Sequence, residues 1–553
     1  MNARSCLFAG LLLLAPVAHA GDELVERLRV RLEVLDRPGE LVAGGTVLYA
    51  VAPLRRFYEQ RGWQPAWFEP DQQERPALAG LIPAIRGAAE QGLDPDDFHL
   101  AALQSEWGYL QRTVPADRQP RRLADIELLA SDALLTLANQ YANGRVDPAR
   151  IDPEWFIQRG TPSVTEALAI AVGGDTGAPA RALGTLLPDV PAYRALVAEL
   201  AAQRGLTESG NWREIPGGPA LHPGERDPRV ADVHSRLEVE PTGSDPALYD
   251  SPLEAAVRRF QADNGLEADG VIGQRTLEAL NVSPARRVEQ LRANLERWRW
   301  LPRDPGNEYL LVDIAGFRLR VVSNGETVME RRVIVGRPYR RTPVFAARMT
   351  YLVLNPSWEV PHKLAVQDIL PHVQAEPDYL SRLGFKVLQG WGAEEKTIDP
   401  ATVNWQALSR ADFPYRLRQA PGPENALGQV KFMFPNPHNV YLHDTPAKGL
   451  FSKEERAFSS GCIRVEDPLP LADWLLDGPD RPAVMTAAEI RRILDIGRET
   501  TVSLTRPLPV YLVYFTARVD DGGTVHYRRD IYGRDAPLID ALDAPAPANP
   551  ESR

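Results

Sequence analysis

The spacing of apolar positions changes along the 553-residue chain, and it is helical in the first part. In "LADIELLASDALLTLANQYANGRVDP" the apolar residues on one helical face are Ile126, Leu129, Ala133, Leu137 and Tyr141. Asn143-Gly144 and then Pro148 predict the end of that helix. A similar start at residues 54–67 is cut off by Pro65. Residues 21–220 show no nucleophile, metal-ligand cluster or phosphate loop, so we expect a helical scaffold domain.

A short unit over residues 227–282 has its own helical pattern. Phe260 supplies an apolar anchor, Gly265 can end a helix, Asp269-Gly270 predicts a turn, and Thr276–Leu280 begins another helix. The acidic loop at residues 267–269 lacks the alternating ligands and distal glutamate of a calcium-binding EF-hand loop. We expect a small helical module.

From about Tyr309 the apolar period becomes two, which predicts a mainly-β domain over residues 307–515. Asn324-Gly325 lies between two β-rich runs and is a strong hairpin signal. Further strands are expected at residues 349–358, 429–434 and 439–445, and "DPLPLADWLLD" reads as a helix. "PLPVYLVYFTARV" and "TVHYRRDIYG" are expected to form a closing pair of strands. A long insertion at about residues 362–415 has helical signals and is either a lid over a cleft or a surface embellishment.

The two ends of the chain have distinct compositions. Residues 1–20 have one positive charge, a short apolar run and Ala18-His19-Ala20, the layout of a cleavable secretory signal; an uncleaved anchor is the alternative. The tail "DAPAPANPESR" is expected to be disordered. The formal net charge of −11 excludes a strongly basic nucleic-acid footprint.

The chain has two cysteines, and removal of the signal with Cys6 would leave Cys462 without a disulfide partner. In an oxidising compartment a lone thiol is a liability, although a buried cysteine can be kept as a small apolar residue. Cys462 follows Ser459-Ser460-Gly461, a small and polar approach that predicts an exposed turn. A reactive thiolate would need a base or a cation nearby.

His443 stands nineteen positions before Cys462 in "NVYLHDTPAKG". A strand, a loop and the cysteine turn would bring imidazole and sulfur together as a Cys/His pair for acyl transfer; a merely structural histidine is the alternative. The side chain of Asp444 should point to the other face of the strand, so its backbone carbonyl is the expected partner of the imidazole.

Other chemistries fit the sequence less well. His362, His372 and His438 lack the tight spacing of a zinc site, and no Gly-x-Ser-x-Gly elbow is present. We therefore expect no metal site.

The pattern His443, then Ser459-Ser460-Gly461-Cys462-Ile463-Arg464, resembles the signature of the L,D-transpeptidases of bacterial cell walls. The position before the glycine is often His in that family and is Ser460 here, so a role of that histidine does not carry over. The large periplasmic branch of the family is also similar in three further stretches: "NLERWRWLP", "VIVGRPYRRTPVF" and "NPSWEVPHKLAVQDILP". Residues 227–282 are similar to the three-helix peptidoglycan-binding module, which grips the wall or only braces the neighbouring domain.

The resemblance implies a multidomain α+β protein. Its expected parts are a signal peptide (1–20), a helical scaffold (21–220), a peptidoglycan-binding module (227–282), a YkuD-type catalytic domain (307–515) with an inserted helical capping subdomain, and a C-terminal strand with a disordered tail (516–553). It implies a periplasmic enzyme that forms 3→3 cross-links through a cysteine thioester and requires no cofactor. A hydrolase that trims stem peptides and a non-catalytic wall-binding protein remain the alternatives.

The resemblance also assigns roles to residues. Cys462 is the expected nucleophile and His443 the general base and acid. The backbone N–H groups of Gly461 and Cys462 are candidates for the oxyanion hole, and Ser460 is a candidate for positioning. Arg464 either holds a substrate carboxylate or braces the turn. The implied partners are peptidoglycan tetrapeptide stems as donor and acceptor and cell-wall synthases, with no nucleic acid, no membrane span after signal cleavage and susceptibility to carbapenems.

Overall fold

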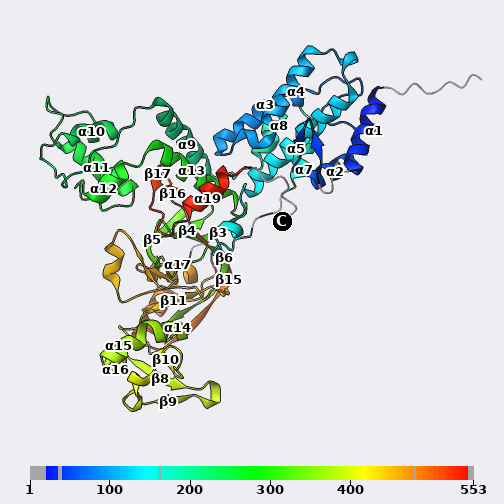
Figure 1. Cartoon of the computed structure of the whole chain (residues 1–553). Helices are drawn as coiled ribbons and strands as arrows, with labels where there is room; N and C mark the ends of the chain where they lie inside the picture. The colour runs from blue at the N-terminus through cyan, green and yellow to red at the C-terminus, as the bar shows by residue number, and fades with distance from the viewer. Residues whose placement is uncertain (1–19, 35–39, 159, 161–162, 479–480, 546–553) are drawn as a thin grey trace, which may run out of the picture. The chain divides into compact units, whose positions relative to one another are not determined.

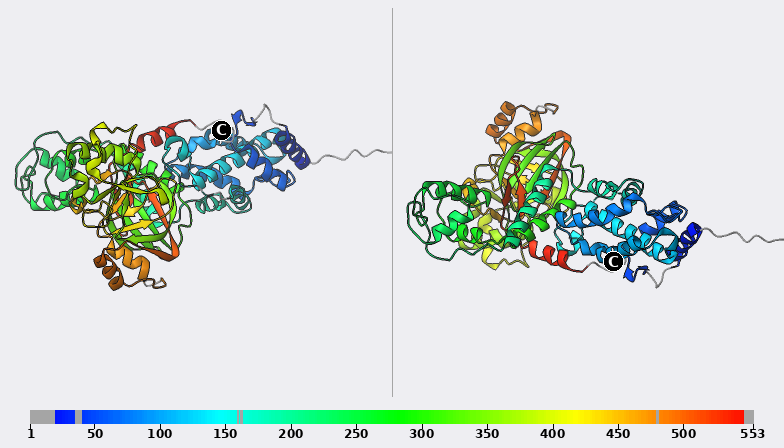
Figure 2. Two further views of the ribbon diagram at one scale, coloured as in Figure 1. Left: turned by 90° about the horizontal axis from the view of Figure 1, so that it is seen from below. Right: turned by 90° about the horizontal axis from the view of Figure 1, so that it is seen from above.

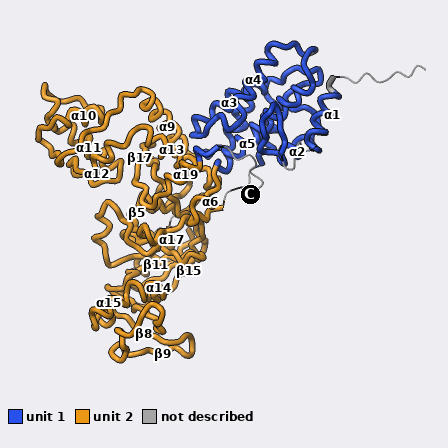
Figure 3. Tube along the Cα trace, viewed as in Figure 1, with its two compact units in different colours: residues 1–145, 160–189, 542–553 blue, residues 146–159, 190–541 orange. Residues whose placement is uncertain are grey.

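The computed structural model describes residues 20–34, 40–158, 160, 163–478 and 481–545, drawn in colour in Figure 1. The predicted signal segment up to residue 19, with Cys6, and the end of the tail from residue 546 lie outside the described residues. The chain divides into two compact units (Figure 3): residues 1–145, 160–189 and 542–553, and residues 146–159 and 190–541.

The first unit is helical, as the sequence predicts. Its helices are α1 (Ala20–Glu33), α2 (Val51–Gln60), α3 (Pro76–Arg86), α4 (Leu100–Arg112), α5 (Pro120–Asn143), α7 (Val164–Val172) and α8 (Ala178–Gly184), with a small β1–β2 hairpin at Val42–Ala43 and Thr46–Val47. Helix α2 ends at Gln60, before the predicted break at Pro65. Helix α5 ends at Asn143 as predicted, with Gly144 as its C-cap.

Helix α5 is buried on nearly all sides, and its acidic residues hold the surrounding loops. The Glu127 carboxylate accepts hydrogen bonds from the backbone N–H groups of Ala66 and Trp67, at 3.0 and 2.8 Å. Asp132 lies 2.7 Å from Nε2 of His99. A buried carboxylate is tolerable only when it is paired in this way. The polar groups of α5 therefore serve the scaffold rather than a reaction.

The second unit begins with helices. Three of them, α10 (Arg229–Arg236), α11 (Ser251–Asp263) and α12 (Gln274–Leu280), form the predicted small module around its own apolar core. Helix α9 (Pro191–Ser209) packs on α13 (Pro284–Arg299) in this second unit. The sequence-based division places α9 in the N-terminal scaffold, and in the structure α9 lies in the second unit.

A closed β-sheet forms the centre of the second unit, and its strands wind around a common core (Figure 2). The strand order is β13-β5-β14-β12-β11-β6-β15-β3-β4, and β4 also pairs with β5. Closure of this kind leaves few unpaired strand edges. The strands are β3 (Glu308–Asp313), β4 (Arg318–Ser323), β5 (Glu326–Gly336), β6 (Phe345–Leu354), β11 (Val430–Met433), β12 (Leu442–His443), β13 (Ala457–Ser459), β14 (Ile463–Val465) and β15 (Thr500–Val513).

The predicted hairpin is present. Strands β4 and β5 pair antiparallel across Asn324-Gly325, both of which have positive φ, as a tight hairpin turn requires. The predicted strand 439–445 is shorter than expected, because only Leu442–His443 pairs with its neighbours. Asn439 has a φ of +54°, so the chain turns there before it enters β12.

The insertion forms a subdomain of its own. Besides helices α14 (His362–Leu364), α15 (Leu370–Ala375) and α16 (Tyr379–Arg382), it contains a four-stranded sheet that the sequence analysis did not foresee. That sheet has the order β7-β10-β8-β9, from β7 (Trp358–Glu359), β10 (Arg416–Gln419), β8 (Phe385–Gln389) and β9 (Lys396–Ile398). A separate apolar cluster fills it, which shows that the subdomain has its own core.

The C-terminal part completes the second unit. Helix α17 (Leu469–Asp477) is the predicted helix, and α18 (Ala487–Ile496) follows it. Strand β15 pairs with β3 and β6, whereas β16 (Ala517–Val519) and β17 (Val525–Tyr527) form a separate hairpin. The two predicted closing runs therefore do not form one simple pair. Helix α19 (Asp535–Asp543) lies between the last predicted strand and the tail that is expected from residue 543.

Candidate active site

Strand pairing brings His443 next to the cysteine turn. Strands β12 and β14 are parallel neighbours, with Leu442 opposite Ile463 and His443 opposite Arg464. Parallel neighbours need a long crossover connection, which is why so many residues separate His443 from Cys462 along the chain. Cys462 immediately precedes β14, two residues before Arg464. Alternation along the strand therefore predicts that its side chain lies on the same face as those of Arg464 and His443.

A cation from the next strand joins this row. Lys431 on β11 is the antiparallel partner of His443, and its Nζ lies 4.0 Å from the centre of the Tyr441 ring. The Tyr441 and His443 rings are 5.6 Å apart. The residues next to these in the three strands, Phe432, Leu442 and Ile463, are fully buried and fill the opposite face of the sheet. Sequence reasoning missed Lys431 and Tyr441, although the two-residue alternation from His443 back to Tyr441 carries a signal for the latter.

The hydrogen bond of His443 fixes its tautomer. Nδ1 of His443 lies 2.5 Å from the carbonyl oxygen of Asp444. A carbonyl oxygen can only accept, so Nδ1 carries the proton and Nε2 is left as an acceptor. The Asp444 side chain instead accepts from the backbone N–H of Gln429 at 2.9 Å and pairs with Lys448. This arrangement suits an imidazole that takes a proton through Nε2.

Burial keeps the imidazole neutral. His443 is 5% exposed, and burial, together with the charges of Arg464 and Lys431, lowers the pKa of its ring to about 3. The hydrogen bond to the Asp444 carbonyl oxygen raises the pKa of the ring, but by less than burial and the two cations lower it. At neutral pH the side chain is therefore a neutral base.

Cys462 is half-buried rather than exposed, which differs from the sequence-based expectation. Burial raises the pKa of its thiol, while hydrogen bonds from the backbone and hydroxyl of Tyr441 and the charges of Lys431 and Arg464 lower it in part. Sγ also lies 3.6 Å from the carbonyl oxygen of Asn439. Cys462 is thus a thiol at rest, one strand away from the neutral His443, with the charges of Lys431 and Arg464 placed to favour the thiolate once the proton leaves.

The cysteine turn is held by hydrogen bonds from several elements. Ser459 Oγ donates to the Cys462 carbonyl oxygen at 2.5 Å and accepts from the Gly461 N–H at 3.1 Å. Thr342 donates to the Gly461 carbonyl oxygen at 2.8 Å. Gly461 has a φ of +117°, a backbone conformation that favours glycine. Because the Gly461 N–H is already engaged, the sequence-based candidate for the oxyanion hole narrows to the N–H of Cys462.

Ser460 and Arg464 stand two residues before and two residues after Cys462. Ser460 is exposed, and its Oγ accepts a hydrogen bond from Arg340 at 2.9 Å. Arg340 also donates to Asp368 and Gln367 of the inserted subdomain, at 2.8 and 3.0 Å. Among the described residues, no acceptor lies within hydrogen-bond distance of the buried Nε of Arg464. Arg464 therefore retains donor capacity beside the thiol.

The described part of the chain contains no group of three or more His, Cys, Asp or Glu side chains arranged to hold a metal ion. It also contains no helix long and apolar enough to cross a bilayer. The chemistry that the described side chains of the site support is proton transfer between a thiol and an imidazole, followed by nucleophilic attack of sulfur.

A half-buried thiol and a neutral histidine on neighbouring strands are the side chains that cysteine acyl transfer uses. Comparison with known protein families finds a match for three segments of the chain. Residues 307–485 match the family described as "L,D-transpeptidase catalytic domain", residues 235–280 the "Putative peptidoglycan binding domain", and residues 52–200 the "Scaffold domain". Three segments of the chain thus match an L,D-transpeptidase catalytic domain, a scaffold domain and a peptidoglycan-binding domain.

One curated relative and one solved structure are each similar to part of the chain. A protein of Haemophilus influenzae named "Putative L,D-transpeptidase" is 37% identical over 248 residues, which are 45% of this chain and 48% of the relative. The chain thus spans about half the length of that relative. The solved L,D-transpeptidase structure from Xylanimonas cellulosilytica aligns with 54% of this chain and 99% of its own, at 16% identity and a TM-score of 0.17. A likeness that low carries no argument about the fold.

Proposed function

We propose that the protein is a periplasmic L,D-transpeptidase that joins peptidoglycan stem peptides by 3→3 cross-links. The observation that carries the proposal is the register of β12 and β14, which sets the neutral His443 opposite Arg464, two residues after Cys462. The family of the catalytic domain supports acyl transfer on peptidoglycan, and the peptidoglycan-binding module supports a polymeric wall substrate. The signal-like first twenty residues support a periplasmic location.

In the first half-reaction, Nε2 of His443 takes the thiol proton and the sulfur of Cys462 attacks the carbonyl carbon of the third stem residue, at its L-centre. The oxyanion that forms is within the field of Arg464 and Lys431 and can accept a hydrogen bond from the Cys462 N–H. The C–N bond to the terminal D-alanine then breaks, and the imidazolium returns its proton to the departing amine. A thioester remains on Cys462.

The low basicity of His443 suits this sequence of proton transfers. An imidazolium flanked by Arg464 and Lys431 is disfavoured, so it gives up its proton readily to a leaving amine. In the second half-reaction the acceptor amine of another stem attacks the thioester, its proton passes to His443, and the C–S bond breaks. The proton then returns to the sulfur, which completes the cycle without a cofactor.

The test is incubation of the purified protein with disaccharide-tetrapeptide, analysed by mass spectrometry. Cross-linked dimers together with free D-alanine are the expected products. Disaccharide-tripeptide and D-alanine without dimers would show that water is the acceptor and the protein is a trimming hydrolase. No product from wild type, and the same result with Cys462→Ala, would leave a non-catalytic wall-binding protein.

A further inference from the structure

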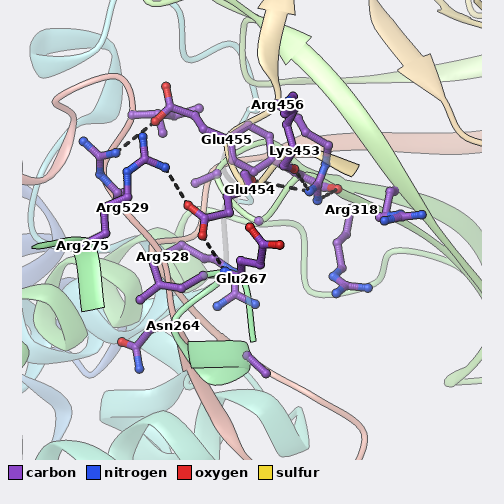
Figure 4. A pocket seen from close by; sticks show the side chains of 18 of the residues that line it. Asn264, Glu267, Arg275, Arg318, Lys453, Glu454, Glu455, Arg456, Arg528 and Arg529 are labelled. Carbon is purple, nitrogen blue, oxygen red and sulfur yellow. Dashed lines mark hydrogen bonds and ion pairs between the residues drawn. The ribbon is translucent and has the colours of Figure 1, made fainter. Parts of the chain in front are cut away.

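A polar pocket lies in the second unit, and its lining does not include the two residues of the candidate active site. Its volume is about 310 Å³, and neither Cys462 nor His443 lines it. One wall comes from the small helical module, at residues 262 and 264–267 and at Arg275. The others come from the β3–β4 turn at residues 315–318, from residues 452–456 in the segment that connects His443 to Cys462, and from Arg528 and Arg529 (Figure 4).

The lining of this pocket is strongly basic. It has seven basic and three acidic side chains: Arg275, Arg318, Arg332, Lys453, Arg456, Arg528 and Arg529, against Glu267, Glu454 and Glu455. Four of the cations have carboxylate partners. Arg275 pairs with Glu454 at 2.6 Å and Arg529 with Glu455 at 3.0 Å, while Arg318 and Arg332 pair with Glu330 and Glu466.

The remaining cations have no such partner. Within the described residues, no carboxylate accepts a hydrogen bond from Lys453, Arg456 or Arg528. Arg456 is 8% exposed and donates only to backbone carbonyl oxygens, among them those of Val333 at 3.2 Å and Phe317 at 3.2 Å. Arg528 is 9% exposed and donates through Nη1 to the carbonyl oxygens of Asp263 and Tyr527, at 2.7 and 2.6 Å.

Like charges surround the two buried guanidinium groups. Burial and the neighbouring Arg318 and Arg332 lower the pKa of Arg456 to about 10. Burial and the charges of Arg518 and Arg318 lower the pKa of Arg528 to about 9, and the carboxylates of Asp313 and Asp263 offset these causes only in part. Both groups remain cationic at neutral pH. A buried charge without a counter-charge is costly, and an oxyanion in the pocket would relieve that cost.

Glu454 fixes the wall that meets the helical module. Its carboxylate accepts from the backbone N–H of Glu267 at 2.5 Å and binds Arg275 at 2.6 Å, and Figure 4 shows it among the basic side chains. The pocket is thus built where the module that matches the peptidoglycan-binding family meets the segment between His443 and Cys462.

We propose that this pocket binds the carboxylates of a peptidoglycan stem peptide at a second site, apart from the reacting cysteine. The proposal rests on the proposed function for the identity of the ligand. Guanidinium groups recognise carboxylate and phosphate alike, and the wall contributed by the peptidoglycan-binding module favours the carboxylate source. The lining has more cations than carboxylates, and the stem peptide rather than the glycan chain carries several carboxylates, so the stem peptide is the part that enters.

The experiment is isothermal titration calorimetry on the full chain carrying Cys462→Ala, which cannot turn substrate over. The probe is disaccharide-tripeptide, which ends in diaminopimelate and has several carboxylates. Lys453→Glu and Arg528→Gln are each expected to weaken binding roughly tenfold, because each removes a cation that the ligand would neutralise. Lys396→Glu, at an exposed lysine of β9, is the matched control and should change the affinity less than twofold.

Lys453 is exposed, so its substitution tests the pocket even if Arg528→Gln fails to fold, which circular dichroism would reveal. Wild-type affinity in Lys453→Glu overturns the proposal. So does tighter binding of inorganic pyrophosphate than of disaccharide-tripeptide with the same dependence on Lys453, because the pocket would then be a phosphate site. The measurement needs no catalysis, so a failure of the cross-linking assay with binding retained would count against the proposed function alone.

Discussion

His443 and Arg464 lie directly opposite each other in the parallel register of β12 and β14. The pair places a permanent cation beside a buried imidazole, and this is one cause of the low pKa of the ring. Because both residues are on paired strands, the backbone hydrogen bonds of the closed sheet hold their separation. A base and a cation at fixed positions beside a thiol are what acyl transfer requires.

Removal of the His443 imidazole should slow the reaction of Cys462 while leaving the thiol in place. His443→Ala is expected to slow acylation of Cys462 by a carbapenem about 10²- to 10⁴-fold, because no other neutral base lies in the row. Intact-mass spectrometry of the adduct over time measures the rate, and Cys462→Ser should form no adduct. A rate for His443→Ala within threefold of wild type would show that another group takes the proton.

The pH dependence of acylation follows from the direction of the two pKa shifts. The ring of His443 stays neutral down to about pH 4, since its pKa is lowered to about 3, and the thiol stays protonated above its ordinary range. The wild-type acylation rate should therefore be nearly flat from pH 5 to pH 8. In His443→Ala the rate should instead rise about tenfold per pH unit, because only free thiolate reacts. A wild-type rate that falls between pH 7 and pH 5 would contradict a neutral, buried imidazole.

The charge of Lys431 should increase the reactivity of the Cys462 thiol. Lys431→Met is expected to slow alkylation of Cys462 by iodoacetamide at pH 7 about three- to tenfold, because the nearby cation favours the thiolate. Lys431→Arg keeps the charge and should recover most of the rate. Equal rates in the methionine and arginine variants would mean that Lys431 acts only by packing against Tyr441.

Gly461 should not tolerate a side chain. Its φ of +117° lies where other residues are strained by about 1 to 3 kcal/mol. Gly461→Ala is therefore expected to reduce the acylation rate at least tenfold while lowering the melting temperature by only a few degrees. Gly449→Ala, in the same connecting segment, has no atom near the added methyl group and serves as the control. Unchanged acylation in Gly461→Ala would show that the turn can rearrange freely.

Arg340 should tie the inserted subdomain to the cysteine turn. Arg340→Ala removes the hydrogen bonds to Ser460 and Asp368 and should raise hydrogen exchange over residues 362–375. We expect kcat/KM for disaccharide-tetrapeptide to fall about five- to twentyfold. The control is Arg382→Ala, which breaks an exposed ion pair with Glu376 in the same subdomain. Identical exchange in both variants would argue against a tie through Arg340.

Much of the fold follows from local patterns. The end of a helix at Asn143 and the Asn324-Gly325 hairpin were predictable, because turn residues and apolar periods are local signals, whereas the three-helix module came from the family resemblance. The sheet of the inserted subdomain was not. Its strands pair residues far apart in the chain, such as Gln419 with Trp358, and sequence periods do not reveal such partners.

Some features of the candidate site could likewise be predicted from the sequence, and others could not. The spacing of His443 and Cys462, read with the family signature, identified the two residues as candidates before any geometry was known. The half-burial of the thiol, the engaged N–H of Gly461 and the approach of Lys431 could not be predicted, because each depends on how three strands align. Even the short polar turn around Cys462, which suggested exposure, is covered by neighbours that only the folded chain supplies.

Tyr532 donates a hydrogen bond to the carbonyl oxygen of Gly336 at 2.6 Å and accepts from the N–H of Thr342, the residue that holds Gly461. Strand β15 likewise lies between β6 and β3, beyond the matched residues 307–485. A chain that ends at residue 485 would thus lack β15, which closes the sheet, and Tyr532, which holds Thr342 and through it the turn at Gly461. A shortened chain intended to isolate the catalytic part needs to run past residue 532.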